Sequence, residues 1–210
     1  NVDQLANLEV VGLDIDASKS DSQWTHGSKH HVFSRTRNAP FFFYYRYLAL
    51  DKMDWYPWEK MQVDIPCYDM EDDDSRIIEN GTFLIPVEWN GRLLIFFPQF
   101  SKKTKSINDE NKSPKTISDE SQISLKPIEY FEIKMAWSEL KNGKWTQKQV
   151  SKDAIYPITV EEKQSVTKEN NKTTTIQETI YSVYNQINCY SFVPFVFKNK
   201  ILIDLYYNGS

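Results

Sequence analysis

A turn signal between two apolar runs is the feature that most constrains how this chain folds. Asn90-Gly91 supplies two residues that tolerate positive φ, as a type I′ turn requires, and the flanks from Phe83 to Phe100 are apolar. In the first flank apolar residues alternate, and one face carries Phe83, Ile85, Val87 and Trp89. The second flank, Arg92–Phe97, is apolar on both faces. The pattern predicts a β-hairpin whose second strand lies deep in a sheet.

The rest of the chain also favours strands. Aromatic residues make up 14% of it and there are only 6 glycines, a composition that suits half-buried pleated surfaces. Alternating or aromatic runs predict strands at 8–15, 31–36, 41–50, 58–65, 129–140, 145–150, 173–184, 189–197 and 200–207. Asn142-Gly143 predicts a second tight turn, and Asn38-Ala39-Pro40 predicts a break after the strand at 31–36. Along 129–140 the inward residues are expected to be Phe131, Ile133, Met135 and Trp137. Three polar segments, 67–79, 101–124 and 161–172, are expected to be exposed loops, and for 101–124 an extended hairpin tip is the alternative. We expect an all-β fold of antiparallel sheets.

The opening hairpin recurs later in the sequence. Phe192–Ile203 overlays Leu84–Ile95, and Pro194 follows Pro86 by 108 positions. In the unit that precedes each copy, Trp58 and Trp145 are expected to correspond. Repetition of a four-strand unit predicts two or more blade-like or sandwich-like repeats. Both prolines lack a ladder donor, so each is expected at a sheet edge or a bulge.

The predicted organisation is two regions of one continuous β structure. Residues 1–155 hold the first repeat and the start of the second, and residues 156–210 complete the second. The chain starts without Met and stops at the turn signal 207–210, so we interpret it as a fragment of a much larger chain.

Charge and cysteine content narrow the class of partner. The formal net charge of −4 argues against nucleic acid. No apolar run reaches the roughly 18 residues of a membrane helix. Cys67 and Cys189 are far apart without metal-ligand spacing. Free thiols are expected for both, and a disulfide between them is left open.

No metal or cofactor site is predicted. The acidic run Asp69–Asp74 lacks the spacing of a calcium loop and is expected to be solvated. The segment from Asp14 begins like such a loop, but its sixth and twelfth positions are Lys19 and Thr25. Of the 3 histidines, His30 and His31 are adjacent, so on a strand they point to opposite faces and cannot easily share one ion; His26 stands apart.

Sialidase-type chemistry is the enzymatic alternative. Most glycosidases use two carboxylates, and sialidases are an exception. Sialidases bind the sugar carboxylate with an arginine cluster and use a tyrosine as the nucleophile. Arg35 and Arg37 share a strand face and could bracket an anion, although pairing with nearby acids is the competing prediction. Trp55 could stack on a sugar, as could Trp24 and Trp137, with core or turn packing as the alternative. The S-x-D-x-G-x-T-W motif of sialidases is absent.

Six stretches, in order, resemble the A component of bacterial Tc (toxin complex) insecticidal toxins, in its neuraminidase-like region. The stretches cover residues 1 to about 155 and are 5–10, 35–40, 44–47, 55–60, 84–97 and 136–145.

The resemblance implies a non-enzymatic shell segment of a secreted bacterial toxin. Family members assemble as homopentamers of the A subunit and work with B and C toxin components. The resemblance also implies host-cell targeting through a surface glycan or receptor, so a carbohydrate- or receptor-binding β module is the alternative function. A sialidase-like glycosidase is the third.

Overall fold

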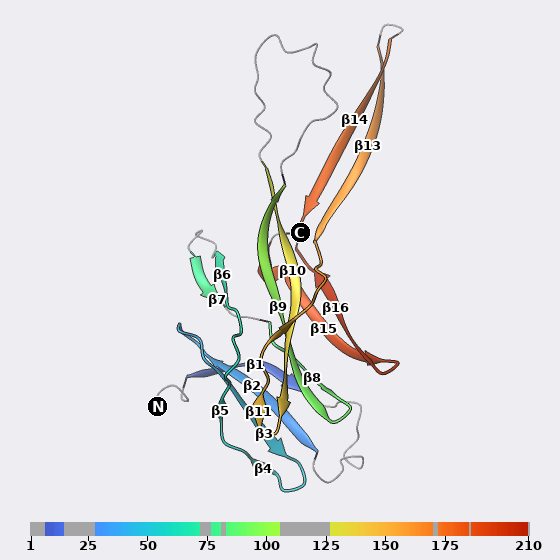
Figure 1. The fold of residues 1–210 in the computed structure, drawn as a ribbon. Coiled ribbons are helices and arrows are strands. Elements are labelled where there is room, and N and C mark those ends of the chain that lie inside the picture. The colour runs from blue at the N-terminus through green and yellow to red at the C-terminus, as the bar shows by residue number, and fades with distance from the viewer. Residues whose placement is uncertain are drawn as a thin grey trace.

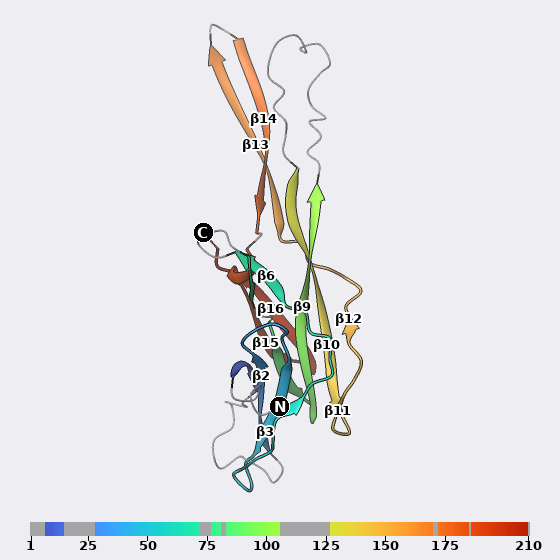
Figure 2. The same ribbon diagram turned by 90° about the vertical axis from the view of Figure 1, so that its left-hand side faces the viewer.

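The computed structural model describes residues 7–14, 28–71, 77–80, 83–105, 127–169, 172–184 and 186–209. Its strands pair antiparallel, and the one helical element among these residues is a short 3₁₀ turn, η3 (Ile187–Cys189). The predicted all-β antiparallel fold is therefore confirmed. Figures 1 and 2 show an elongated body with long ribbons extending from one end.

The first sheet has the order β1 (Leu8–Asp14), β2 (Lys29–Thr36), β3 (Phe43–Ala49) and β4 (Asp54–Trp55), with β5 (Glu59–Lys60) also pairing β3. A bulge between Val10 and Gly12 interrupts the β1–β2 register. Strand β2 ends before the predicted break at Asn38–Pro40.

The second sheet is built around the hairpin predicted from Asn90-Gly91. Its order is β11 (Lys144–Trp145), β10 (Ile128–Lys141), β9 (Arg92–Lys105) and β8 (Ile85–Trp89), with β12 (Gln149–Val150) also pairing β10. Asn90 and Gly91 have φ values of 51° and 70°, and Asn142 and Gly143 have 51° and 73°. Both predicted tight turns are therefore confirmed. Strand β9 lies between β8 and β10 and is largely buried on both faces over 93–98, while Ser101–Lys105 are exposed.

The two sheets repeat one plan, in which a long strand is followed by a return strand in two short pieces. Strands β4 and β5 pair with β3 as β11 and β12 pair with β10. Between the pieces, the Tyr56 N–H donates to the Tyr47 carbonyl at 2.9 Å, and the Thr146 N–H donates to the Glu139 carbonyl at 2.8 Å. The two sheets therefore repeat one four-strand plan. The predicted unit, a Trp-bearing hairpin followed by a Pro-bearing hairpin, is divided between sheets, because β3–β5 end the first sheet and β8–β9 begin the second.

The tryptophan correspondence within this repeat needs a correction. Trp55, and not Trp58, occupies the place of Trp145, because Trp55 pairs with Leu48 as Trp145 pairs with Leu140. The strand predicted at 58–65 is also mostly wrong, since only Glu59–Lys60 is strand. Burial still alternates there, with Met61 and Ile65 buried. An extended backbone points successive side chains to opposite faces whether or not it is hydrogen-bonded to a neighbouring strand.

The hairpin of β15 (Tyr190–Phe197) and β16 (Lys200–Tyr207) repeats β8–β9 in register. Pro194 pairs with Ile203 as Pro86 pairs with Ile95, which confirms the 108-position offset. Lys198 and Asn199 form the turn with φ values of 46° and 59°. Strand β8 ends its sheet and β15 belongs to a two-stranded sheet, so both prolines lie on edge strands as predicted.

The second sheet is the middle of three layers. The main core lies between it and the first sheet, and its fully buried members include Phe33, Ile95, Phe97 and Ala136. A second cluster joins its other face to β15–β16 through Phe131, Ile133 and Tyr190, with Phe100 and Phe192 packed against them. The stack is thus a series of blade-like layers.

Burial along β10 differs from the predicted alternation. Phe131 and Ile133 are buried as expected, but further along Ala136 and Ser138 are buried while Trp137 is only half-buried. The reason is the three-layer stack: one end of β10 faces the β15–β16 layer, and its other end faces the first sheet.

Two polar segments predicted as loops are hairpins. Strands β6 (Tyr68–Glu71) and β7 (Ile77–Asn80) occupy most of 67–79, and β13 (Ile158–Glu169) pairs with β14 (Lys172–Val183) across 161–172. Ladder hydrogen bonds join backbone groups, so a polar sequence does not prevent pairing. For 101–124 the extended-hairpin alternative holds over Ser101–Lys105, which belong to β9; residues 106–126 lie outside the described part.

Both cysteines are free thiols. Asp72–Asp74 of the acidic run, Trp24, His26 and residues 15–25 of the calcium-like segment lie outside the described residues. No helix in the described part of the chain has the length and hydropathy needed to cross a membrane.

Candidate functional site

Arg35, the first predicted anion-binding residue, lies inside the fold. It is 6% exposed, and its guanidinium pairs with the Glu9 carboxylate at 2.5 Å across the β1–β2 ladder. The same guanidinium lies 4.6 Å from the ring centre of Phe41. The cation is therefore engaged in joining β1 to β2, which matches the competing prediction that Arg35 pairs with a nearby acid.

Arg37 and Trp55 lie apart from that pair. Arg37 is exposed just beyond the end of β2, where its N–H donates to the Asn7 carbonyl at 3.3 Å. Arg35 pairs with Phe43 at one end of β3, whereas Trp55 pairs with Leu48 at the other end. The three predicted site residues are not brought together by the sheet.

Trp55 instead belongs to an arginine–tryptophan stack that includes Arg46. The Arg46 guanidinium lies 4.2 Å from the ring centre of Trp55 and 4.4 Å from that of Trp58. Trp55 remains 49% exposed. Such cation–π contacts hold the indole in place while leaving an aromatic face in solvent. Arg46 was not among the residues predicted from the sequence; the signal that could have identified it is the Trp-Tyr-Pro-Trp run at 55–58, which follows a strand that carries a single arginine.

A second cluster, between the first two layers, contains His31, Tyr45 and Glu88. The ring nitrogen Nδ1 of His31 lies 2.9 Å from the Tyr45 hydroxyl, and Nε2 lies 3.8 Å from a Glu88 carboxylate oxygen. Burial is the largest cause that raises the pKa of Tyr45, and electrostatic repulsion from Tyr47 and from nearby carboxylates raises it further. A tyrosine nucleophile must lose its proton, and burial of this kind favours the neutral phenol.

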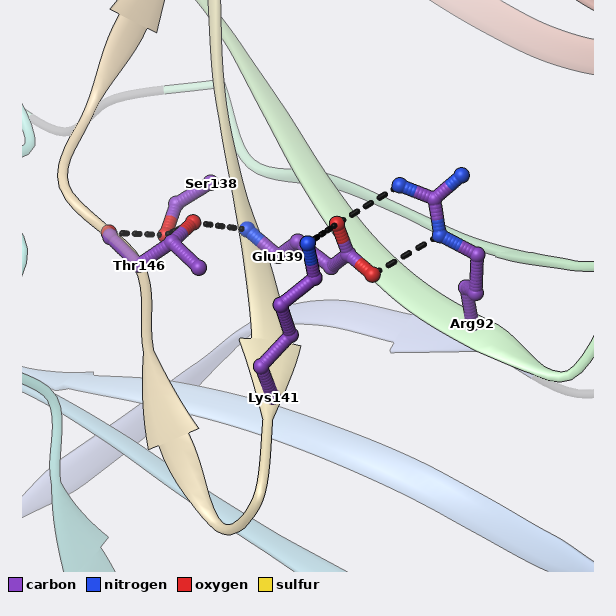
Figure 3. A network of polar contacts seen from close by, with 5 residues as sticks. All are labelled: Arg92, Ser138, Glu139, Lys141 and Thr146. Carbon is purple, nitrogen blue, oxygen red and sulfur yellow. Dashed lines mark hydrogen bonds and ion pairs between the residues drawn. The ribbon is translucent and has the colours of Figure 1, made fainter.

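The strongest polar network joins β9 to the β10–β11 hairpin (Figure 3). Arg92 donates from Nε to Oε1 of Glu139 at 2.7 Å and from Nη2 to Oε2 at 2.6 Å, and Lys141 adds an ion pair of 3.3 Å to Oε2. These contacts, with the Arg92 hydrogen bond the largest cause, lower the pKa of Glu139 to about 2. A carboxyl held ionised in this way cannot serve as the general acid of a glycosidase at neutral pH.

Ser138 and Thr146 extend this network across the broken return strand. The Ser138 hydroxyl donates to the Thr146 carbonyl at 2.6 Å, and the Glu139 N–H donates to the Thr146 hydroxyl at 2.9 Å (Figure 3). Ser138 is fully buried, so its hydroxyl needs this partner. The network fixes strand geometry where β11 and β12 separate.

These contacts describe an all-β protein of stacked blade-like layers, in which the buried charged groups Arg35 and Glu139 each pair with a residue on a neighbouring strand. Residues 8–207 match the family described as the neuraminidase-like domain, and the chain belongs to that family. The neuraminidase-like part of the sequence resemblance is thereby confirmed.

Similar solved structures include the cryo-EM structure of Morganella morganii TcdA4. It is 14% identical to this chain with a TM-score of 0.43, and the match covers 90% of this chain and 7% of TcdA4. The chain thus spans a small part of the length of that structure. No curated protein matches the chain.

Proposed function

We propose that this chain is a non-catalytic structural segment of the shell of a Tc-type toxin A component. The proposal rests on membership of the neuraminidase-like family over residues 8–207 and on the six ordered stretches that resemble Tc toxin A components. The two-region division at residue 155 is retained as part of this proposal.

One observation supports a structural role above the others: the charged groups suited to sugar chemistry are engaged between strands. Arg35 pairs with Glu9, and Arg92 pairs with Glu139 in a bidentate contact. Tyr45 lies buried beside His31, and its phenol is stabilised in the neutral form. Each of these groups joins two strands or two layers, so its removal would loosen the stack.

The proposed setting follows from the resemblance. The segment would act in a secreted bacterial toxin, assembled with other copies of the A subunit as a homopentamer and completed by B and C components. Within that assembly a layered β segment supplies a stiff wall, because each layer buries apolar side chains against the next.

Turnover of a fluorogenic sialoside by the purified chain tests the absence of catalysis. The expected rate equals that of a protein-free control, while an authentic sialidase is active in the same assay. Turnover that disappears in Arg35→Lys or Tyr45→Phe would refute the proposal. The mass of the natural full-length protein, measured by mass photometry, tests assembly: a pentamer is expected, and a monomer at micromolar concentration contradicts it.

A second candidate function, glycan binding, is favoured by the exposed indole of Trp55 over Arg46. Aromatic faces stack on the apolar side of sugars, and the fixed indole loses little freedom on binding. A glycan array with the wild-type chain and Trp55→Ala tests it. Binding that Trp55→Ala removes, and that the exposed-residue control Met53→Ala retains, would establish this function; silence across the array would remove it.

A further inference from the structure

The outer face of the β15–β16 hairpin is largely apolar and is uncovered in the described part of the chain; its polar members are Ser191, Lys200 and Asp204. Alternate positions on this face carry Val193, Phe195, Phe197, Leu202 and Tyr206, and each side chain is between 39 and 55% exposed. The opposite face of the same hairpin carries Tyr190, Phe192 and Leu205, which pack on the second sheet. Large apolar side chains on both faces of one two-stranded ribbon are typical of a layer inside a stack.

The register of the repeat shows which buried face the outer face corresponds to. With the 108-position offset, Val193, Phe195 and Leu202 take the places of Ile85, Val87 and Leu94 in β8–β9. Those three residues are only 5–6% exposed. One hairpin design therefore has this face buried in the first copy and exposed in the second.

The cover over the first copy is itself a hairpin, β15–β16. The ring centres of Phe83 and Phe192 lie 5.0 Å apart at one end of the contact. At the turn end, the Asn90 side chain donates to the Asn199 side chain at 2.8 Å. Ile85 and Val87 lie between these two contacts, beneath β15.

The contact between the first and second sheets is built in the same way. The first strand of the second sheet, β8, contacts β1, where Gly12 lies so close that an added Cβ would be 3.3 Å from Pro86 Cδ. Strands β1, β8 and β15 thus begin three successive layers, and each of the first two is covered by the hairpin of the next (Figures 1 and 2).

We propose that the outer face of β15–β16 binds a further antiparallel β-hairpin with apolar side chains at alternate positions, supplied from outside these 210 residues and not by a second copy of them. Its facing side chains would match the inward face of β15–β16, where Phe192, Pro194 and Ile203 lie. The proposal is independent of catalysis and of glycan binding, because it depends on the register of two hairpins alone.

Site-specific photocrosslinking tests the proposal in the polypeptide as the producing organism makes it. Benzoylphenylalanine replaces Phe195 on the outer face, Phe83 as the positive control that contacts Phe192, and Met53 as an exposed control. The Phe83 variant is expected to crosslink to peptides of 190–207. The Phe195 variant is expected to crosslink, at comparable yield, to one segment outside residues 1–210 with an alternating apolar pattern and a tight turn.

Three results would overturn the proposal. They are a Phe195 crosslink yield no higher than that at Met53, a crosslink to residues 1–210 of another copy, and a crosslink to a segment without strand pairing. Maleimide labelling of Leu202→Cys gives a second measurement that does not rely on the bulky probe. Protection of that thiol relative to Met53→Cys is expected, and equal reactivity contradicts a covered face.

Discussion

The side-chain amide of Asn90 donates a hydrogen bond of 2.8 Å to the side-chain oxygen of Asn199, 109 positions further along the chain, so the turns of the two repeated hairpins touch. Each asparagine lies in a two-residue turn with positive φ at both positions. The hairpins stack with their turns at the same end (Figure 1). This contact identifies the repeat as a spatial series of layers and not merely a similarity of sequence.

The turn of the second hairpin is less well suited to its geometry than the first, because Lys198 has a φ of 46°. A non-glycine residue in the left-handed region costs about 1–2 kcal/mol. Lys198→Gly is therefore expected to raise the free energy of unfolding by about 0.5–1 kcal/mol, after the greater freedom of glycine in the unfolded chain is subtracted. Urea denaturation measures it. Lys200→Gly, inside β16, serves as the control and should destabilise the fold.

The Arg92–Glu139 pair makes stability depend on pH at the acid end. The pKa of Glu139 is lowered to about 2 from an ordinary 4.5, so the folded state binds this proton less tightly than the unfolded state. The stabilisation is present above about pH 4.5 and is lost as the pH falls toward 2. Glu139→Gln is expected to cost about 1–3 kcal/mol at pH 7, as for hydrogen bonds to charged groups.

Denaturation of both proteins at pH 7 and pH 3 checks this. The gap between wild type and Glu139→Gln should narrow at pH 3, while Glu129→Gln, exposed on the same strand, should change stability little at either pH. An unchanged gap at the two pH values would show that the carboxylate does not carry the effect.

Phe97 is the central side chain of the middle layer and is fully buried. Phe97→Ala removes apolar contacts and leaves a cavity, so a loss of about 3–5 kcal/mol is expected. Phe195→Ala removes the same atoms from the exposed face of β15 and should change the stability of the isolated chain by about 1 kcal/mol or less. Chemical denaturation of the two variants compares them. Equal losses would contradict the assigned core.

Tyr68 anchors β6 to β9, because its hydroxyl donates to the Pro98 carbonyl and accepts the Phe100 N–H at 3.2 Å. Burial, the largest cause, raises its pKa to about 12 from 10. A raised pKa in the folded state stabilises the fold fully below pH 10, and this stabilisation is lost as the pH rises through about 12.

Tyr68→Phe is accordingly expected to cost about 1–2 kcal/mol at pH 8, through the unpaired Phe100 N–H. An alkaline titration of phenolate absorbance distinguishes the two proteins further. The missing tyrosine should reduce the absorbance change only above about pH 11, where wild-type Tyr68 ionises. A difference already complete at pH 10 would rule out the buried hydrogen bonds as the cause.

Local signals in the sequence were sufficient for much of the fold. Asn90-Gly91 and Asn142-Gly143 predicted their turns because the required positive φ values are chemically specific. The apolar run of β9 predicted a central strand, because only burial on both sides explains two apolar faces. Edge positions were predicted for Pro86 and Pro194, because proline has no backbone N–H to donate to a neighbouring strand.

Other features depended on contacts that no local pattern encodes. A strand was predicted at 173–184, where β14 lies, but the polar sequence of β13 gave no sign of the partner strand, since backbone ladders form without apolar side chains. Face alternation in β10 changes because two different layers cover its two ends. Arg46 could not be predicted as a site residue, because its role depends on the Trp55 and Trp58 rings, which the fold brings against its guanidinium. Arg35 was identified as a candidate, but its partner Glu9 is brought to it by the β1–β2 register.

The prolines of the two repeated hairpins have a consequence for how this material grows. Pro86 and Pro194 each stand in the first strand of a layer, at an open rim of hydrogen-bonding groups. Without an N–H, neither rim can recruit a stray strand along its full length. A further layer can therefore pack on the face of an existing one, whereas pairing of an added strand along these edges is hindered. The two prolines thus favour growth by face-to-face stacking over edge-to-edge pairing, the contact that leads to aggregation.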